Sequence, residues 1–151
     1  MFLLDTNVLS HIAPARRRTK AHDELASWIV SHSEELWLSV VTAAEIEDGI
    51  AKATRIGATK KAEDLAEWWG EIRHYYADRI LPLGMETAKE TGRLMDRARA
   101  VGIDPGFEDI AIAATGKING LTVLTRNTKD FVGLGVKHQN PFEGLPTDAP
   151  G

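Results

Sequence analysis

Short apolar runs alternate with amphipathic stretches along almost the whole chain, and this alternation limits the fold more than any other feature. The apolar runs have the length and composition of buried strands and lie at residues 2–4, 36–41, 80–83 and 121–125, with Val136 in a possible fifth. Between them, apolar residues recur at helical spacing at about residues 8–12, 21–33, 42–57, 59–76, 86–101 and 107–119. This order predicts an α/β fold of three layers, in which helices flank a mostly parallel central sheet.

The length of 151 residues corresponds to one domain, which we place at residues 1–145, followed by a flexible tail at 146–151. The chain has no cysteine, which excludes disulfides, thiol catalysis and cysteine-based zinc sites. Its apolar runs are too short for a transmembrane helix, and Asp5 interrupts the apolar start before a secretory signal can form. We therefore expect a protein of the cytoplasm with no membrane partner.

Three acidic residues lie where the predicted fold would bring them to one edge of the sheet. Asp5 follows the first strand, Glu45 lies in the first turn of the helix after the second strand, and Asp109 lies in the first turn of the helix before the fourth. The carboxyl ends of parallel strands and the amino ends of the helices share one edge, where ligands bind in such folds. Asn127 and Asp130 follow the fourth strand and would join them.

Each acid also has a purely structural interpretation. Asp5 is suited to a turn or a helix cap. Glu45 completes a capping box with Thr42, in which each side chain bonds a free backbone N–H. Asp109 could simply complement the dipole of its helix. Structural caps would be scattered over both edges of the sheet, so the grouping of all three acids at one edge favours a common site.

Carboxylates that are not paired with Lys or Arg repel one another, and a divalent cation relieves that repulsion. Oxygen ligands without cysteine or paired histidine suit Mg²⁺ or Mn²⁺ rather than zinc, and the five histidines form no HExxH motif. Such a metal can activate water and stabilise the charge of an in-line attack on a phosphate. The acids therefore predict metal-dependent phosphate chemistry.

Four segments, in order, resemble a known family: residues 3–10 (LLDTNVLS), 42–46 (TAAEI), 109–115 (DIAIAAT) followed by 120–131 (GLTVLTRNTKDF), and 140–143 (NPFE). They resemble PIN-domain ribonucleases, specifically the VapC-type toxins of bacterial toxin–antitoxin pairs. The resemblance implies a PIN-like fold and a metal-dependent endoribonuclease that leaves 5′-phosphate and 3′-hydroxyl ends. It also implies inhibition by a small antitoxin protein and a homodimeric state.

The resemblance implies that Asp5, Glu45 and Asp109 are catalytic acids that bind Mg²⁺ or Mn²⁺. Many family members carry a fourth acid where this chain has Asn127, which brings no charge, and Asp130 is a candidate to replace it as a ligand. The remaining expected roles are carboxylate positioning by Thr6, Asn7 and Thr125, and phosphate contact by Arg126 and Lys129. Lys129 could equally be an ordinary solvated charge.

Two other functions are compatible with the sequence. Because Asn127 weakens the acid set, the chain could be a binding module that docks an antitoxin or RNA without cutting it. A receiver-like phosphoacceptor would also use acids at a sheet edge, but it needs a second acid beside Asp5 and a Lys in place of Arg126. The aromatic face with Trp68 and Trp69 suits core packing or, from the resemblance, a dimer or antitoxin groove.

The net charge of −4 argues against a broad RNA-binding face, because phosphate binding usually leaves a basic surface. Residues 21–50 hold seven acids and no Lys or Arg, so much of the negative balance lies there. The densest basic run, from Arg16 to Lys20, could approach RNA phosphates or an acidic antitoxin segment, or be solvated. We therefore expect weak, metal-dependent RNA contact through a local basic patch.

Overall fold

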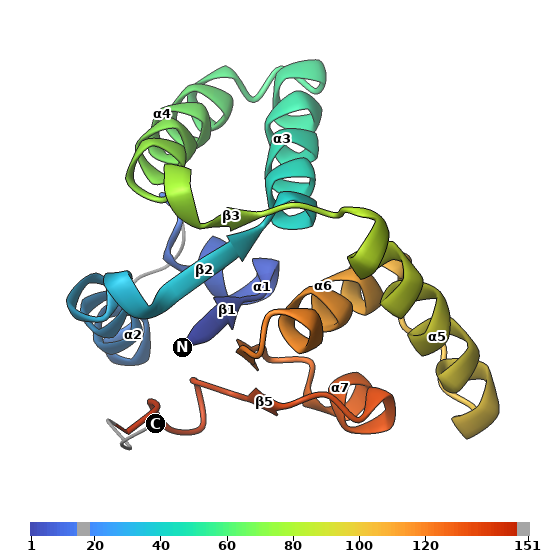
Figure 1. Cartoon of the computed structure of the whole chain (residues 1–151). Coiled ribbons are helices and arrows are strands. Elements are labelled where there is room, and N and C mark those ends of the chain that lie inside the picture. Colours follow the sequence, from blue (N-terminus) through green and yellow to red (C-terminus); the bar gives the residue numbers. More distant parts are fainter. Residues whose placement is uncertain (15–18, 148–151) are drawn as a thin grey trace.

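Five parallel strands form the central sheet. In the computed structural model, which describes residues 1–14 and 19–147, the strands are β1 (Phe2–Leu4), β2 (Leu36–Ser39), β3 (Ile80–Leu81), β4 (Thr122–Leu124) and β5 (His138–Gln139). Their order is β3-β2-β1-β4-β5, and every neighbouring pair is parallel (Figure 1). The strand order reverses beside β1, which is where open α/β sheets bind their ligands.

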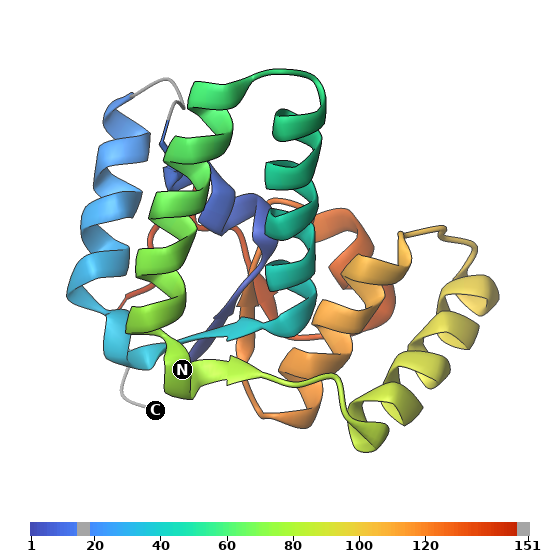
Figure 2. The same cartoon turned by 90° about the horizontal axis from the view of Figure 1, so that it is seen from above.

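Helices cover both faces of this sheet. They are α1 (Thr6–Leu9), α2 (Lys20–Ser31), α3 (Val40–Arg55), α4 (Thr59–Tyr75), α5 (Met85–Val101), α6 (Phe107–Ile118) and α7 (Thr128–Leu134), with short 3₁₀ turns at Ser10–Ile12, Ser33–Glu35 and Ala77–Arg79. One face packs against α1 to α4 and the other against α5 to α7 (Figures 1 and 2). The predicted three-layer α/β fold is therefore confirmed.

The buried side chains form two apolar cores, one on each face of the sheet. Successive residues of β1 point to opposite faces, so Leu3 belongs to the core under α5 to α7 and Leu4 to the core under α1 to α4. Val123 and Leu124 of β4 divide in the same way. Because both faces are buried, these strands are continuously apolar rather than alternating, which is the pattern that predicted them.

The start of α3 differs from the prediction. The predicted strand at 36–41 ends at Ser39, whose extended backbone (φ −104°, ψ 147°) makes it the cap of α3. The Ser39 hydroxyl accepts a hydrogen bond from the Val41 N–H at 3.0 Å. The predicted capping box of Thr42 and Glu45 is therefore wrong, because Thr42 lies inside the first turn and Glu45 in the second.

Two further differences lie near the end of the chain. Val136 is buried but precedes β5, which pairs with β4 through His138 and Gln139 instead. The helix α7 was not predicted, because it is short and carries a glycine at position 133. It ends at Leu134 and is capped by Gly135, whose φ of 68° suits a residue without a Cβ.

Some predictions fall partly outside the described residues. Of the basic run from Arg16 to Lys20, residues 16–18 lie outside them, whereas Thr19 caps α2 and Lys20 begins it. Of the tail expected at 146–151, residues 148–151 lie outside them, so the tail stays a prediction. Within the part of the chain that is described, no helix is long and apolar enough to cross a membrane.

Candidate active site

The topology brings the three predicted acids to the carboxyl edge of the sheet. Asp5 directly follows β1, and its backbone N–H still donates to the Leu124 carbonyl of β4 at 3.0 Å. Glu45 lies in the second turn of α3 and Asp109 in the first turn of α6. The charge of Asp109 raises the pKa values of both Asp5 and Glu45, so the three carboxylates share one electrostatic environment.

Asp5 is the most enclosed of the three acids, with 2% of its surface exposed. Its Oδ1 accepts the Thr6 backbone N–H at 2.7 Å, and its Oδ2 accepts the Thr125 hydroxyl at 2.7 Å and the Asn7 amide at 3.2 Å. Burial raises the pKa of Asp5 to about 6, with help from the charges of the other two acids and against the lowering effect of the Thr125 and Thr6 bonds. The expected positioning groups therefore do contact this carboxylate.

Thr6 links Glu45 to the rest of the site. The Thr6 hydroxyl lies 2.7 Å from Glu45 Oε1 and 2.9 Å from the Thr42 hydroxyl. Because a hydroxyl carries one proton, Thr42 must donate to Thr6 when Thr6 donates to Glu45. Burial is the main cause that raises the pKa of Glu45, and the charges of Glu108 and Asp109 add to it.

Asn127 joins Asp109 to Asp130. Its amide nitrogen donates to Asp109 Oδ2 at 3.2 Å and to Asp130 Oδ2 at 2.9 Å. Burial raises the pKa of Asp109, and the charges of Asp130 and Glu108 raise it further, whereas the Asn127 bond lowers it. The neutral amide thus bridges two acids without adding to their repulsion, which a fourth carboxylate at this position could not do.

Sequence reasoning missed two residues at this edge, Thr42 and Glu108. Thr42 is buried beside Thr6, and its position three residues before Glu45, on the same helix face, is the signal that could have placed it there. Glu108 adjoins Asp109 at the start of α6, and its charge raises the pKa values of Glu45 and Asp109. The sequence signal that could have placed Glu108 at the site is its position next to Asp109 in the first turn of the same helix.

The two residues expected to contact phosphate, Arg126 and Lys129, differ in the contacts that they make with the rest of the protein. The Arg126 backbone N–H donates to Asn7 Oδ1 at 3.2 Å, and its guanidinium lies 4.6 Å from the centre of the Phe142 ring. Lys129 is exposed on α7 and makes no hydrogen bond or ion pair with the residues that the structure describes. Arg126 is therefore fixed beside a partner of Asp5, whereas Lys129 is placed like an ordinary solvated charge.

The donor set suits a hard divalent cation, although the carboxylates do not enclose one as they stand. Glu45 Oε2 and Asp109 Oδ1 accept no hydrogen bond from the described residues, so both oxygens are available as ligands. Within residues 1–14 and 19–147, no group of three or more His, Cys, Asp or Glu side chains is close enough to hold a metal ion. Metal binding would therefore require side-chain movement within this group of acids.

The acids and their partners fall within a known sequence family. The profile of the PIN domain matches residues 2–135, which include Asp5, Glu45 and Asp109. This chain belongs to the PIN domain family. The family expected from the four sequence segments is therefore confirmed.

Relatives of this PIN domain match it over nearly its full length. It is 37% identical over 145 residues to plasmid stability protein StbB of Pseudomonas syringae pv. tomato, covering 95% of this chain and 99% of that protein. It is 32% identical over 144 residues to VapC ribonuclease Y4jK of Sinorhizobium fredii, with coverage of 95% and 99%. It is 33% identical over 144 residues to toxin FitB of Neisseria gonorrhoeae, with coverage of 94% and 99%.

A solved structure shares both the fold and part of the sequence of this PIN domain. It is the structure of FitAB bound to an IR36 DNA fragment, in which the matching chain has a TM-score of 0.81 and 31% sequence identity. The match covers 99% of this chain and 100% of that chain. The arrangement of the sheet and helices is therefore shared from end to end.

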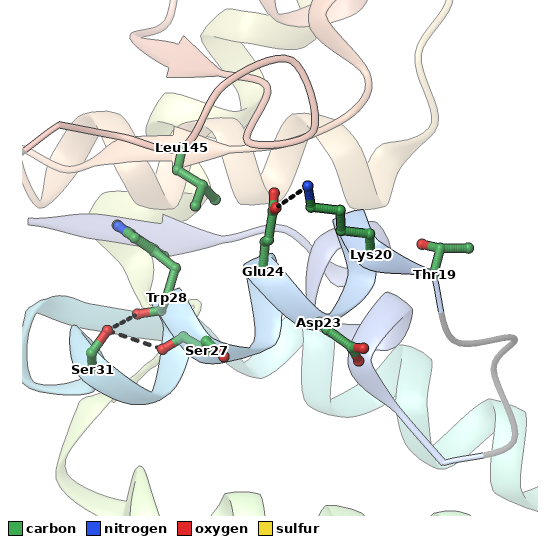
Figure 3. Close-up of a pocket in the computed structure, with 8 residues that line it drawn as sticks. All are labelled: Thr19, Lys20, Asp23, Glu24, Ser27, Trp28, Ser31 and Leu145. Carbon is green, nitrogen blue, oxygen red and sulfur yellow. Dashed lines mark hydrogen bonds and ion pairs between the residues drawn. The ribbon is translucent and has the colours of Figure 1, made fainter.

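Two surface cavities of this PIN domain relate differently to the acids. One, of about 600 Å³, lies between α1, α3 and α4 and includes Thr6 and Glu45 in its lining; we call it the α3–α4 groove. The other, of about 790 Å³, follows α2 and is lined in part by Trp28 and Leu145 (Figure 3). The α3–α4 groove is thus the cavity that opens at the acid edge.

The two tryptophans of the predicted aromatic face have separate places. Trp69 is buried in the core, and its indole N–H donates to Glu47 Oε1 at 2.9 Å. Trp68 is half-buried and lines the α3–α4 groove. Core packing therefore accounts for Trp69, whereas Trp68 packs against the same core and also forms part of a surface that a ligand can reach.

Proposed function

We propose that this PIN domain is a metal-dependent endoribonuclease and the toxin of a VapBC-like toxin–antitoxin pair. The observation that carries the proposal is the meeting of Asp5, Glu45 and Asp109 at one sheet edge, where the charges acting on their pKa values all belong to other carboxylates. Similarity to proteins named VapC ribonuclease Y4jK and toxin FitB, at 32% and 33% identity, supports the same assignment.

We infer that Asp5, Glu45 and Asp109 would hold Mg²⁺ or Mn²⁺, because three carboxylates with oxygen ligands alone suit these cations better than zinc. Asp130 is a further candidate ligand, joined to Asp109 through the Asn127 amide. When bound, the cation supplies an activated water and positive charge for the attacked phosphate. Breaking the bond from phosphorus to the 3′ oxygen leaves 5′-phosphate and 3′-hydroxyl ends.

The neighbouring side chains restrict how the carboxylates of Asp5 and Glu45 can turn. Thr125 and Asn7 fix one oxygen of Asp5, and the Thr6 hydroxyl fixes one oxygen of Glu45. Such hydrogen bonds limit the rotation of the acids without neutralising them. Arg126 and Lys129 are the proposed contacts to RNA phosphates, and the RNA substrate makes the cytoplasm the expected place of action.

An antitoxin protein is the proposed partner, and the α3–α4 groove is its proposed seat. The groove has an apolar wall that includes Ile46, Leu65 and Trp68, which suits the apolar face of a partner helix. An occupant of the groove would cover Glu45 and so block the acid edge. A homodimer is also expected from the family resemblance and is checked by light scattering of the purified chain.

The central experiment is cleavage of total bacterial RNA by the purified chain in Mg²⁺ or Mn²⁺, with EDTA as the metal-free control. Asp5→Asn, Glu45→Gln and Asp109→Asn should each reduce cleavage by about a hundredfold or more. Asp104→Asn, which changes an exposed acid outside the cluster, should leave cleavage unchanged. A wild-type chain that does not cut RNA, or acid variants that cut equally well, would contradict the proposal.

A binding module without nuclease activity is the second candidate. Two observations favour it: Asn127 stands at the fourth acid position, and the described acids do not form a ready metal site. Calorimetry separates the two candidates. Uptake of Mg²⁺ or Mn²⁺ supports the nuclease, whereas no uptake together with tight antitoxin binding supports the module.

A further inference from the structure

Arg126 is held over an aromatic ring although an acid cluster lies beside it. Its guanidinium is 4.6 Å from the centre of the Phe142 ring, and no carboxylate of residues 1–14 and 19–147 forms a salt bridge with it. Yet Arg126 directly follows Thr125, whose hydroxyl bonds Asp5. The carboxylates attract the long, flexible side chain of Arg126, so some other interaction must hold its guanidinium over the Phe142 ring.

The Phe142 ring is itself fixed by its surroundings. The His11 ring meets it edge to face, with centres 4.7 Å apart and planes at 83°. The Phe142 backbone N–H donates to Asn140 Oδ1 at 2.9 Å, which holds the turn that carries the ring. The half-buried ring also packs against the apolar core under α1 to α4. Phe142 is therefore a rigid platform for the guanidinium.

We propose that Phe142 is a positioning residue of the RNA site, which holds the Arg126 guanidinium away from the acids and ready to bind an RNA phosphate. This inference rests on the proposed ribonuclease function. A guanidinium stacked on a ring keeps its N–H groups free for a phosphate. Fixing its position in advance also reduces the entropy lost when RNA binds.

Two observations favour RNA over a protein partner as the ligand of Arg126. The Arg126 backbone N–H bonds Asn7, and the Asn7 amide bonds Asp5, each at 3.2 Å, so the base of this side chain is tied to the most buried acid. The α3–α4 groove proposed for the antitoxin includes Thr6 and Glu45 but, among the described residues, neither Arg126 nor Phe142. Arg126 therefore lies at the acids and outside that groove.

The test measures KM and kcat separately, with an oligoribonucleotide that spans the cleavage site mapped in total RNA. Phe142→Leu keeps an apolar side chain but removes the ring, and it should raise KM about two- to fivefold, the range of an exposed cation–π contact, with kcat nearly unchanged. Phe142→Tyr keeps the ring and should restore the wild-type KM. In an Arg126→Ala background, Phe142→Leu should have no further effect on KM.

Phe2→Leu is the matched control. Phe2 is also a half-buried ring packed on the same core, where it contacts Trp28 edge to face at 5.7 Å. The same substitution there should lower the melting temperature without changing KM. If both variants changed KM equally, the effect of Phe142 would be loss of packing alone, and the proposal would be wrong.

Other outcomes overturn the proposal in distinguishable ways. A wild-type chain that cuts no RNA would remove the proposed function and this inference together. An active wild type with unchanged KM in Phe142→Leu, or with the same rise in the Arg126→Ala background, would remove only the inference. Unchanged KM together with weaker inhibition by the antitoxin would assign Arg126 to the protein partner instead.

Discussion

Thr6, Thr125 and Asn127 each donate a hydrogen bond to a carboxylate at the sheet edge. A neutral donor orients a carboxylate but leaves its charge in place, so the repulsion among the acids persists. This repulsion and burial both raise the pKa values of the three acids. At the scale of single residues, the ionised carboxylates therefore lower the stability of the metal-free protein. We expect a bound cation to offset this cost.

Asp5→Asn should make the metal-free protein more stable at neutral pH. The pKa of Asp5 is about 6 in the fold and about 4 in an unfolded chain. Between these pH values the folded state binds more protons than the unfolded state, so the free energy of unfolding falls as the pH rises from about 4 to 6 and stays low above. The loss is on the order of 3 kcal/mol. The neutral amide removes the buried charge, but its NH2 must face one of the groups that donate to Asp5, so the variant regains only part of this loss.

Urea unfolding in EDTA measures this effect. The free energy of unfolding of the variant should exceed that of the wild type at about pH 8 and match it near pH 3, where Asp5 is protonated in both the folded and the unfolded state. Glu63→Gln, at an exposed acid of α4, should show no such difference. Equal stability of Asp5→Asn and wild type at pH 8 would show that the burial of this charge has no net cost.

Asn127→Asp should weaken the metal-free fold and strengthen Mn²⁺ binding. The change replaces two donated hydrogen bonds with a carboxylate beside Asp109 and Asp130, at a cost of about 1 to 3 kcal/mol. The added charge is also a further ligand for a cation. Asn127→Ala separates the two effects, because it removes the hydrogen bonds to Asp109 and Asp130 without adding charge. If calorimetry found the same Mn²⁺ affinity in Asn127→Asp and Asn127→Ala, a carboxylate at position 127 would not be a metal ligand.

At the scale of elements, α3 connects the sheet to the site. Ser39 ends β2 and caps α3, so the helix begins directly at the carboxyl edge of the sheet and its first turns lie beside that edge. Thr42 and Glu45 then lie three residues apart on one helix face, and both reach the Thr6 hydroxyl. The cap and the positioning group are thus different residues, whereas the sequence assigned the cap to Thr42 and gave it no positioning role.

Ser39→Ala and Thr42→Val should therefore separate stability from activity. Loss of the Ser39 cap should lower the free energy of unfolding by about 0.5 to 2 kcal/mol while kcat changes little. Loss of the Thr42 hydroxyl should reduce kcat about tenfold, because Thr6 then loses one of its two partners. Thr42→Ser keeps the hydroxyl and should retain activity. If Thr42→Val lowered stability without changing kcat, Thr42 would be the cap after all and not a positioning residue.

The sequence predicted the order of most strands and helices because both faces of the sheet are buried, which makes β1, β2 and β4 largely apolar. The polar strand β5 and the short helix α7 carry no such pattern and were not predicted. It predicted that Asp5, Glu45 and Asp109 meet because parallel topology alone brings them to one edge. It did not predict the cap of α3, because Ser39 and Thr42 are equally able to cap and only the end of β2 decides between them. Nor did it predict the contact of Phe142 with Arg126, since a ring contact across 16 positions leaves no periodic pattern.

At the scale of the whole molecule, the net negative charge and the carboxylates at the sheet edge both repel RNA phosphates. The net charge is −4, and the carboxylates at the edge include Glu108 and Asp130 besides the three candidate ligands. An RNA phosphate that approaches this edge meets like charge at short range. We therefore expect a cation to favour RNA binding as well as cleavage.

Removing divalent metal should lower RNA affinity about tenfold or more, because phosphate and carboxylate then repel each other directly. Fluorescence anisotropy with a labelled oligoribonucleotide measures this with Mg²⁺ and with EDTA at constant ionic strength. The double variant Glu45→Gln, Asp109→Asn has lost two of the charges and should bind RNA in EDTA better than the wild type does. Equal affinity of the wild type in both buffers would exclude this electrostatic role of the metal.

The central strand β1 comes from the first residues of the chain, whereas its neighbour β4 comes from residues 122–124. Asp5 and Thr125, which bond each other, are 120 positions apart. During translation the ribosome therefore releases Asp5 long before the partners that enclose it, and the fold can close only when nearly the whole chain has emerged. A nascent chain therefore has no finished site until Thr125 has emerged, so each copy of the protein can acquire activity only near the end of its own synthesis.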